Sequence, residues 1–306
     1  MPKIHEYLQP YLKYLDHVKG LSEGTILCEK KVILLFLRWL DEFKDKDITE
    51  VETIDTPLIL SHLKEKAFVR NKRALQSYLG ILRRFFEYLK IFGFKTENPL
   101  AKVIPARVSS WHRLRIPLTY EEIKKVFQEV RKPTRIKSDR IRNLAIINML
   151  YFYGLRSKEL RNLKIGDVDF INKAIKIDAK GNTERLLPLT ENIAGLLTDY
   201  LNIRSKSSSD YFFVTLTGRK MDDNFLAKTV GKYGQRIGLK KRLSPYVFRC
   251  TCATHMLESG KFNIVEIQKW LGHQTVDSTR RYVHISGWLI REALNRHPIN
   301  KMTFFK

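Results

Sequence analysis

Four short segments carry side chains that could bind and react with an anion such as a phosphate group. The first is residues 153–160, with the sequence YGLRSKEL. Gly154 ends one predicted helix, Ser157 is placed to cap the next, and Arg156 lies in the turn between them. A guanidinium beside the free N–H groups of a helix N-terminus makes a good anion site. Because Glu159 follows Arg156 by three residues, it is close enough to orient the arginine.

A second arginine is predicted near the start of a helix in residues 243–255. Ser244 suits the N-cap and Pro245 the first helical position. Tyr246 and Arg249 then lie one turn apart on one face, where the helix dipole favours an anion. The pattern predicts phosphate binding by Arg249, with Tyr246 on the same face of the helix. The alternative is that Tyr246 packs at the helix start and points away from the cleft.

A third segment places a lysine in a predicted β-hairpin. Alternating periodicity predicts a three-stranded antiparallel sheet with strands at 168–170, 174–177 and 185–189. Lys180 opens the turn between the second and third strands. A lysine on a flexible turn can reach into a cleft and donate a proton. Most lysines at hairpin tips are only solvated, so the position by itself leaves both roles open.

The fourth segment contains a histidine and a tyrosine. Gly272 ends a predicted helix, His273 follows it, and Tyr282 lies nine residues after the histidine. Asp277 or Ser278 can begin the next helix. Together the four segments form a set of polar residues that is unusual for a helical protein.

The order of these residues resembles the tyrosine recombinases, which include the lambda-integrase-like phage integrases and the Xer-type recombinases. The resemblance rests on Arg156, Lys180, Arg249, the Leu-Gly-His of 271–273, and Tyr282, and it covers nearly the whole chain. It implies a fold that is mainly α with a small antiparallel β-sheet. An N-terminal helical core-binding domain would precede a C-terminal catalytic domain.

One position departs from the family pattern, because Tyr246 stands where family members usually carry a histidine. Histidine titrates at about pH 6.5 and tyrosine at about pH 10, so only histidine readily exchanges protons at neutral pH. A phenol can still donate a hydrogen bond to a phosphate oxygen. Tyr246 is therefore expected to contact the phosphate without acting as a general base.

The resemblance implies that Tyr282 attacks phosphorus to form a 3′-phosphotyrosyl intermediate while Lys180 protonates the departing 5′-oxygen. The two arginines would bind the non-bridging oxygens in forked geometry. The other site residues would bind the phosphate or support the arginines: Tyr246, His273 and Glu159. The covalent bond conserves the phosphodiester energy, and the sequence offers no obvious carboxylate cluster for a metal. No metal ion, ATP or other cofactor is therefore expected.

The charge of the chain favours a polyanionic partner. Its 306 residues hold 56 Lys and Arg against 32 Asp and Glu, which gives a net charge of +24. Nucleic acid accounts for this excess better than an anionic membrane does. The net charge is −3 over residues 1–59, +8 over 60–110 and +19 over 111–306. This gradient predicts that one side of an N-terminal domain faces DNA.

Helical periodicity and proline positions predict three parts. Residues 1–104 form a helical DNA-clamp domain, 105–117 a basic linker, and 118–306 the catalytic domain with its C-terminal tail. Ser22 and Thr56 are predicted to cap helices of the first domain. The predicted DNA-binding residues lie in a long helical segment and in the linker: Arg70, Lys72, Arg73, Arg83, Arg84, Arg113 and Arg115. A linker that is merely solvated is the alternative.

Neither a membrane span nor a secretory signal is expected. The longest apolar stretch, residues 144–155, is too short to cross a bilayer, and the N-terminus lacks an uninterrupted apolar core. Three cysteines cannot form a disulfide framework. These features predict a reduced, cytoplasmic protein.

The resemblance also implies an assembly. Double-stranded DNA with an inverted-repeat core site would be the partner, and four active sites would be needed for two sites of two strands each. A homotetramer that exchanges C-terminal tails is therefore expected, and it would integrate, excise, invert or resolve DNA. The alternatives are relaxation of DNA by a type IB topoisomerase-like activity and a DNA-binding regulator with reduced catalysis. The Leu-Gly-His segment and the two-domain layout favour a recombinase.

Overall fold

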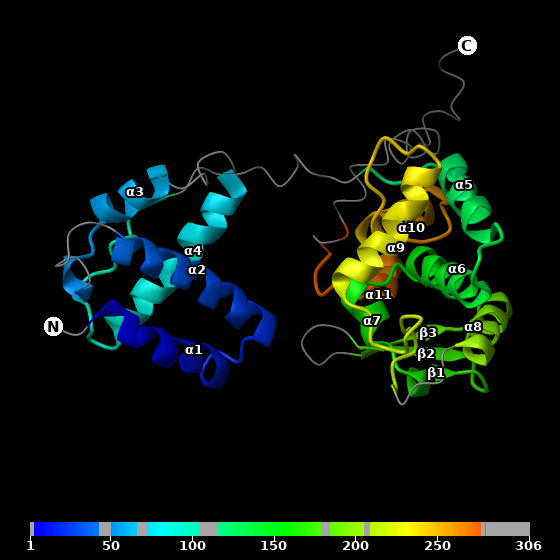
Figure 1. Cartoon of the computed structure of the whole chain (residues 1–306), viewed down its shortest axis with the longest axis horizontal. Helices are drawn as coiled ribbons and strands as arrows, with labels where there is room; N and C mark the ends of the chain where they lie inside the picture. Colours follow the sequence, from blue (N-terminus) through cyan, green and yellow to red (C-terminus); the bar gives the residue numbers. More distant parts are fainter. Residues whose placement is uncertain are drawn as a thin grey trace, which may run out of the picture. The chain divides into compact units, whose positions relative to one another are not determined.

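The computed structural model describes residues 3–42, 50–65, 72–104, 116–178, 184–204, 209–276 and 279. The chain divides into two compact units, Met1–His112 and Arg113–Lys306 (Figure 1). The expected fold class is confirmed, because helices predominate and the described strands form one three-stranded antiparallel sheet. No helix in these ranges is both long and apolar enough to cross a membrane.

The N-terminal unit is a cluster of α-helices with short 3₁₀ turns at Ile4–Tyr7 and Val51–Thr53. Its described α-helices are α1 (Leu8–His17), α2 (Glu23–Glu42), α3 (Thr56–Glu65) and α4 (Lys72–Ile91). Helix α2 packs against both α1 and α4. The apolar residues of α4 recur every three or four positions, which places them on one face. That face is buried in the core of the unit: Leu79, Leu82, Phe85, Phe86 and Leu89.

The capping predictions for this unit have different outcomes. Helix α2 begins directly after Ser22, as predicted. The prediction for Thr56 is wrong, because the side chain of Asp55 accepts the backbone N–H of Leu58 at 2.9 Å. Thr56 is already the first helical residue, and its hydroxyl donates instead to the carbonyl of Pro99. An aspartate one residue earlier can satisfy the free N–H groups, so the threonine is available for a tertiary contact.

The C-terminal unit is built around one buried helix. Its described α-helices are α5 (Tyr120–Arg131), α6 (Lys137–Phe152), α7 (Ser157–Asn162), α8 (Glu191–Ile203), α9 (Asp223–Arg236), α10 (Pro245–Glu258) and α11 (Ile264–Leu271). Helix α6 packs against α5, α8 and α10. It buries consecutive residues from Ala145 to Leu150, as expected of a helix covered on all sides.

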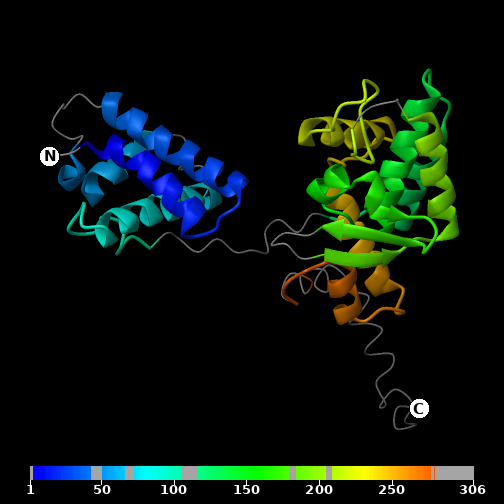
Figure 2. The ribbon, with the colours of Figure 1, turned by 90° about the horizontal axis from the view of Figure 1, so that it is seen from below.

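The small sheet sets the direction of the side chains on its third strand. Strands β1 (Val168–Asp169), β2 (Ala174–Asp178) and β3 (Glu184–Pro188) pair antiparallel in that order. Figure 2 shows α11, in orange, next to these strands. Arg185 pairs with Ile177, which is 1% exposed. Because cross-strand partners share a face of the sheet, Arg185 points to the buried side.

Candidate active site

The turn between α6 and α7 brings the first arginine against α11. Gly154 has φ +58°, a conformation that a side chain disfavours. A Cβ atom on Gly154 would lie 2.5 Å from Cδ2 of Leu271, so the backbone here also needs the space. Gly154 follows the end of α6, as the sequence predicted. Glycine is required because the turn packs tightly against α11.

Arg156 occupies the N-cap of α7, and the prediction that Ser157 caps this helix is wrong. The Glu159 side chain accepts from the Arg156 backbone N–H at 2.9 Å, so the acidic residue of the first turn supplies the reciprocal contact. Ser157 is the first helical residue, and its hydroxyl lies 2.6 Å from a carboxylate oxygen of Asp223. The Arg156 guanidinium donates to Glu159 Oε1 at 2.5 Å and to the Gly272 carbonyl at 3.0 Å.

The second arginine lies in the first turns of α10. Ser244 is the N-cap and Pro245 the first helical residue, so both predictions are confirmed. Arg249 is 3% exposed. Its Nη1 donates to the Gly154 carbonyl at 2.6 Å and its Nη2 to the Leu271 carbonyl at 2.8 Å. Arg249 thus joins the α6–α7 turn to the end of α11.

Glu159 lies at the centre of the cluster and is 4% exposed. Besides Arg156, it binds Arg185 through both carboxylate oxygens, at 3.2 and 3.0 Å, and its Oε2 lies 4.0 Å from Arg249 Nη1. Burial alone would raise the pKa of the Glu159 carboxyl. Hydrogen bonds from Arg185 and Arg156, with the charges of Arg185 and Arg249, outweigh burial and hold this pKa below its usual value. The carboxylate is therefore ionised at neutral pH.

Arg185 was not among the residues predicted from the sequence. Its side chain is 10% exposed and its Nε donates to the Trp270 carbonyl at 3.1 Å. One signal was available, since Arg185 and the buried Leu187 are two residues apart on a strand and so share a face. An arginine on the inward face of a strand needs a buried partner, and Glu159 is that partner.

His273 follows the left-handed C-cap of α11 at Gly272, whose φ is +64°. Its backbone N–H donates to the Gln268 carbonyl at 3.0 Å. Its Nδ1 lies 2.7 Å from the Thr279 hydroxyl. The residue is therefore held at both its backbone and its ring, one position after the carbonyl that Arg156 binds.

Tyr246 is 38% exposed, whereas the next three residues of α10, Val247, Phe248 and Arg249, are all buried. Its side chain therefore reaches solvent at the start of the helix. Lys180 and Tyr282 lie outside the described residues. Their roles stay predictions from the sequence.

The basic residues predicted for the DNA-facing side of the N-terminal unit differ in environment. Lys72 and Arg73 are exposed at the start of α4. Arg84 is 54% exposed and donates to the buried Glu29 at 2.7 and 3.0 Å. Arg83 is half-buried, and its guanidinium binds the carbonyls of Leu100 and Val103, so it fastens the segment after α4. Three predicted residues lie outside the described ranges: Arg70, Arg113 and Arg115.

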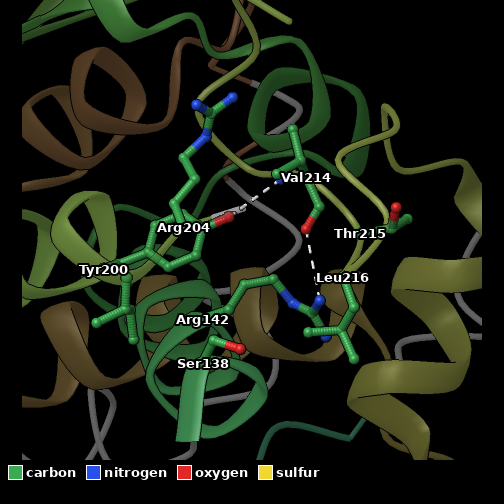
Figure 3. A pocket seen from close by; sticks show the side chains of 8 residues that line it. Ser138, Arg142, Tyr200, Arg204, Val214, Thr215 and Leu216 are labelled. Carbon is green, nitrogen blue, oxygen red and sulfur yellow. Dashed lines mark hydrogen bonds between the residues drawn. The ribbon is translucent and has the colours of Figure 1, made fainter. Parts of the chain in front are cut away.

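A hollow of about 250 Å³ lies elsewhere in the C-terminal unit, between α6, α8 and the segment 214–216 (Figure 3). The Tyr200 hydroxyl accepts the Val214 backbone N–H at 3.1 Å across it. The Arg142 guanidinium is 3% exposed, donates to the Val214 carbonyl at 3.5 Å and is also bound by Asp139 and Asn143. These contacts hold the segment against the two helices.

Comparison with known proteins agrees with this fold. Residues 117–287 match the phage integrase family, and residues 8–91 match the phage integrase N-terminal SAM-like domain. A tyrosine recombinase of Pseudothermotoga lettingae is 32% identical over 94% of this chain and 97% of its own. Tyrosine recombinase XerD of Staphylococcus haemolyticus is 28% identical over 95% of this chain and 98% of its own.

Solved structures share the fold. XerH recombinase bound to a palindromic difH substrate, in a post-cleavage complex, has a TM-score of 0.74 at 22% identity, over 95% of this chain and 84% of its own. A lambda integrase dimer bound to a COC′ core site has a TM-score of 0.71 at 17% identity, over 94% of this chain and 97% of its own. The chain belongs to the phage integrase family of tyrosine recombinases. Members of this enzyme class cleave and rejoin DNA.

Proposed function

We propose that this chain is a site-specific DNA recombinase that cleaves and rejoins DNA through a 3′-phosphotyrosyl intermediate on Tyr282. The observation that carries the proposal is the joining of Arg156 and Arg249 on one carboxylate, Glu159. Residues that are far apart in the sequence converge there, next to the His273 backbone. A pair of arginines fixed in this way suits the two non-bridging oxygens of a phosphodiester.

The charge of the cluster favours a bound phosphate. Three guanidinium groups, those of Arg156, Arg185 and Arg249, surround one carboxylate, so a net positive charge remains. Arg156 has a side chain that is 37% exposed, whereas Arg249 is almost fully buried. Arg156 would therefore contact the phosphate most directly, and Arg249 would act at the inner edge of the site. Fixed positive groups stabilise the charge that develops on phosphoryl oxygens in the transition state.

The reaction would follow from the remaining residues. The Tyr282 hydroxyl loses its proton to solvent as its oxygen forms a bond to phosphorus. The bond from phosphorus to the 5′-oxygen breaks, and Lys180 supplies the proton that this oxygen takes up. Tyr246 and His273 would hydrogen-bond the phosphate. A 5′-hydroxyl from the partner DNA then attacks the phosphotyrosyl bond and releases Tyr282. The intermediate conserves the bond energy, so the scheme needs no ATP.

DNA with an inverted-repeat core site is the proposed substrate, bound by a homotetramer that exchanges C-terminal tails. The net charge of +24 supports a long contact with a duplex. The exposed residues of α4, Lys72, Arg73 and Arg84, would contact the backbone, together with Arg70, Arg113 and Arg115. We also propose a cytoplasmic location, because three cysteines cannot form a disulfide framework.

A suicide DNA substrate tests the proposal. The substrate carries a nick near the cleavage position, so that the cleaved fragment diffuses away and the protein stays attached. The DNA that flanks the gene is cut into short duplexes and each is tested separately. A recombinase gives a covalent adduct at one sequence. Adducts at many unrelated sequences would indicate a topoisomerase, and DNA binding without an adduct on any duplex would indicate a regulator.

A further inference from the structure

We propose that Arg185 is a positioning residue of the active site, one that holds Glu159 so that Arg156 and Arg249 stay available to the phosphate. The proposal rests on the proposed function above. Arg185 comes from strand β3, whereas the two arginines come from the α6–α7 turn and from α10. Because its guanidinium binds both oxygens of Glu159, Arg185 would affect the reaction through this carboxylate.

The contacts of Arg185 use three nitrogens of its guanidinium. Nη1 and Nη2 donate to the two oxygens of Glu159 at 3.2 and 3.0 Å, and Nε donates to the Trp270 carbonyl at 3.1 Å. The forked contact fixes the plane of the carboxylate as well as its position. The third contact ties the same guanidinium to the end of α11. Lysine has a single nitrogen and cannot make these three contacts in one plane.

The end of α11 is where all three arginines meet. Its carbonyls at Trp270, Leu271 and Gly272 accept from Arg185, Arg249 and Arg156 respectively. A Cβ atom on Gly272 would lie 2.7 Å from Nη1 of Arg185, so this glycine also leaves the space that Arg185 fills. Arg185 is thus packed into the same backbone segment that orients the other two arginines.

Arg185 also sets the net charge of the cluster formed by the three arginines and Glu159. With Arg185 present, one carboxylate is shared among three arginines, and the cluster keeps two net positive charges. Without Arg185, Glu159 would be balanced only by the two arginines that are to bind the phosphate. The carboxylate would then neutralise the charge of one of these two arginines and halve the net charge of the cluster. Neutralisation of the scissile phosphate should weaken as a result.

The test compares two suicide substrates that differ only at the scissile phosphate. One carries an ordinary phosphodiester, and the other a methylphosphonate, in which a methyl group replaces one non-bridging oxygen and removes the negative charge. Variants Arg185→Gln and Arg185→Lys are measured with the wild type. Lys176→Gln is the matched control. The Lys176 side chain lies on the neighbouring strand, is 42% exposed and pairs with an exposed glutamate, so this variant removes a cation from an exposed position.

We expect Arg185→Gln to cleave the phosphodiester about 100-fold more slowly than the wild type, because the two arginines that stabilise the transition state would lose both position and net charge. On the methylphosphonate its rate should fall less than about threefold, because the charge that the arginines neutralise is absent. Arg185→Lys, which keeps the charge but not the fork, should lie between, and Lys176→Gln should match the wild type on both substrates.

Equal losses on the two substrates, for either Arg185 variant, would show that Arg185 only maintains the fold and would overturn the proposal. The same conclusion follows if Lys176→Gln shows the same substrate-dependent loss. If Arg185→Gln melts at a much lower temperature than the wild type, Arg185→Lys is used for the comparison instead. Failure of the proposed function is distinguishable, because the wild type itself would then form no adduct on the phosphodiester.

Discussion

Arg249 donates a 2.6 Å hydrogen bond to the backbone carbonyl of Gly154, so the first turns of α10 are tied to the turn that carries Arg156. The glycine has a left-handed backbone and lies against Leu271 of α11. The bond therefore fixes the Arg249 guanidinium to the backbone of the turn that carries Arg156. The relative placement of the two guanidinium groups is fixed before DNA binds, which is the condition for electrostatic preorganisation.

Arg249→Lys should therefore slow cleavage by about 100-fold or more, because lysine lacks the planar fork with which Arg249 binds the Gly154 and Leu271 carbonyls. Single-turnover cleavage of the suicide substrate measures this. Arg236→Lys is the control, since the Arg236 side chain is 53% exposed and lies outside the cluster. Similar rates for Arg249→Lys and the wild type would show that the two carbonyl contacts do not matter for the chemistry.

Tyr282→Phe should abolish the covalent adduct while DNA affinity changes less than about threefold, because only the nucleophilic oxygen is removed. Denaturing gels detect the adduct, and a binding titration on the same DNA gives the affinity. Tyr233 is 1% exposed and hydrogen-bonded to Asn143, so it is shielded from a DNA strand. An adduct that persists in Tyr282→Phe would point to another nucleophile.

Tyr246→Phe should slow cleavage about tenfold to a hundredfold, the effect of one lost hydrogen bond to a charged group. Tyr246→His should restore or raise the rate, because histidine can both donate to the phosphate and exchange a proton near neutral pH. Rates at two pH values for the wild type and both variants decide the matter. If Tyr246 is instead a packing residue, the phenylalanine variant keeps the wild-type rate and the histidine variant loses stability.

Glu159→Gln should lower the free energy of unfolding by about 3 kcal/mol at neutral pH, because it removes the charge from a buried ion cluster. The pKa of Glu159 is lower in the native state than its unfolded value of about 4.3. Its stabilising effect is therefore complete above the unfolded pKa and disappears as the pH falls through the native pKa.

Urea unfolding of both proteins at about pH 7, 4 and 3 checks this expectation, because the loss begins only below the unfolded pKa. The difference between the wild type and Glu159→Gln should be largest at the highest pH and shrink toward the lowest. Glu121→Gln, at an exposed position of α5, should stay within about 0.5 kcal/mol of the wild type throughout. A difference between the wild type and Glu159→Gln that stays constant with pH would show that the Glu159 charge does not stabilise the fold.

DNA affinity should fall steeply with salt, with a log–log slope of about −6 or steeper, since about seven or more phosphate contacts are expected. Titrations at several salt concentrations give the slope. Arg84→Gln should make it shallower by about one unit. Arg83→Gln, in contrast to the expectation from the sequence, should leave the slope unchanged, because the Arg83 guanidinium is bound to backbone carbonyls. If DNA affinity does not change with salt concentration, the net charge does not drive DNA binding.

Much of the local structure followed from the sequence because it depends on local interactions. Ser244 and Pro245 marked the start of α10, and alternation of apolar residues marked the strands of the small sheet. The two capping errors, at Thr56 and Ser157, are shifts by one residue. In each case a neighbouring residue took the N-cap, Asp55 in one and Arg156 in the other.

The composition of the arginine cluster was decided only by tertiary structure. The sequence by itself placed Arg156 and Arg249 near the starts of helices and placed Glu159 three residues after Arg156. It did not reveal Arg185, because a strand pattern shows which face a side chain takes but not which element covers that face. The packing of β3 against α7 and α11 brings Arg185 onto Glu159, and an ionised carboxylate buried there requires such partners.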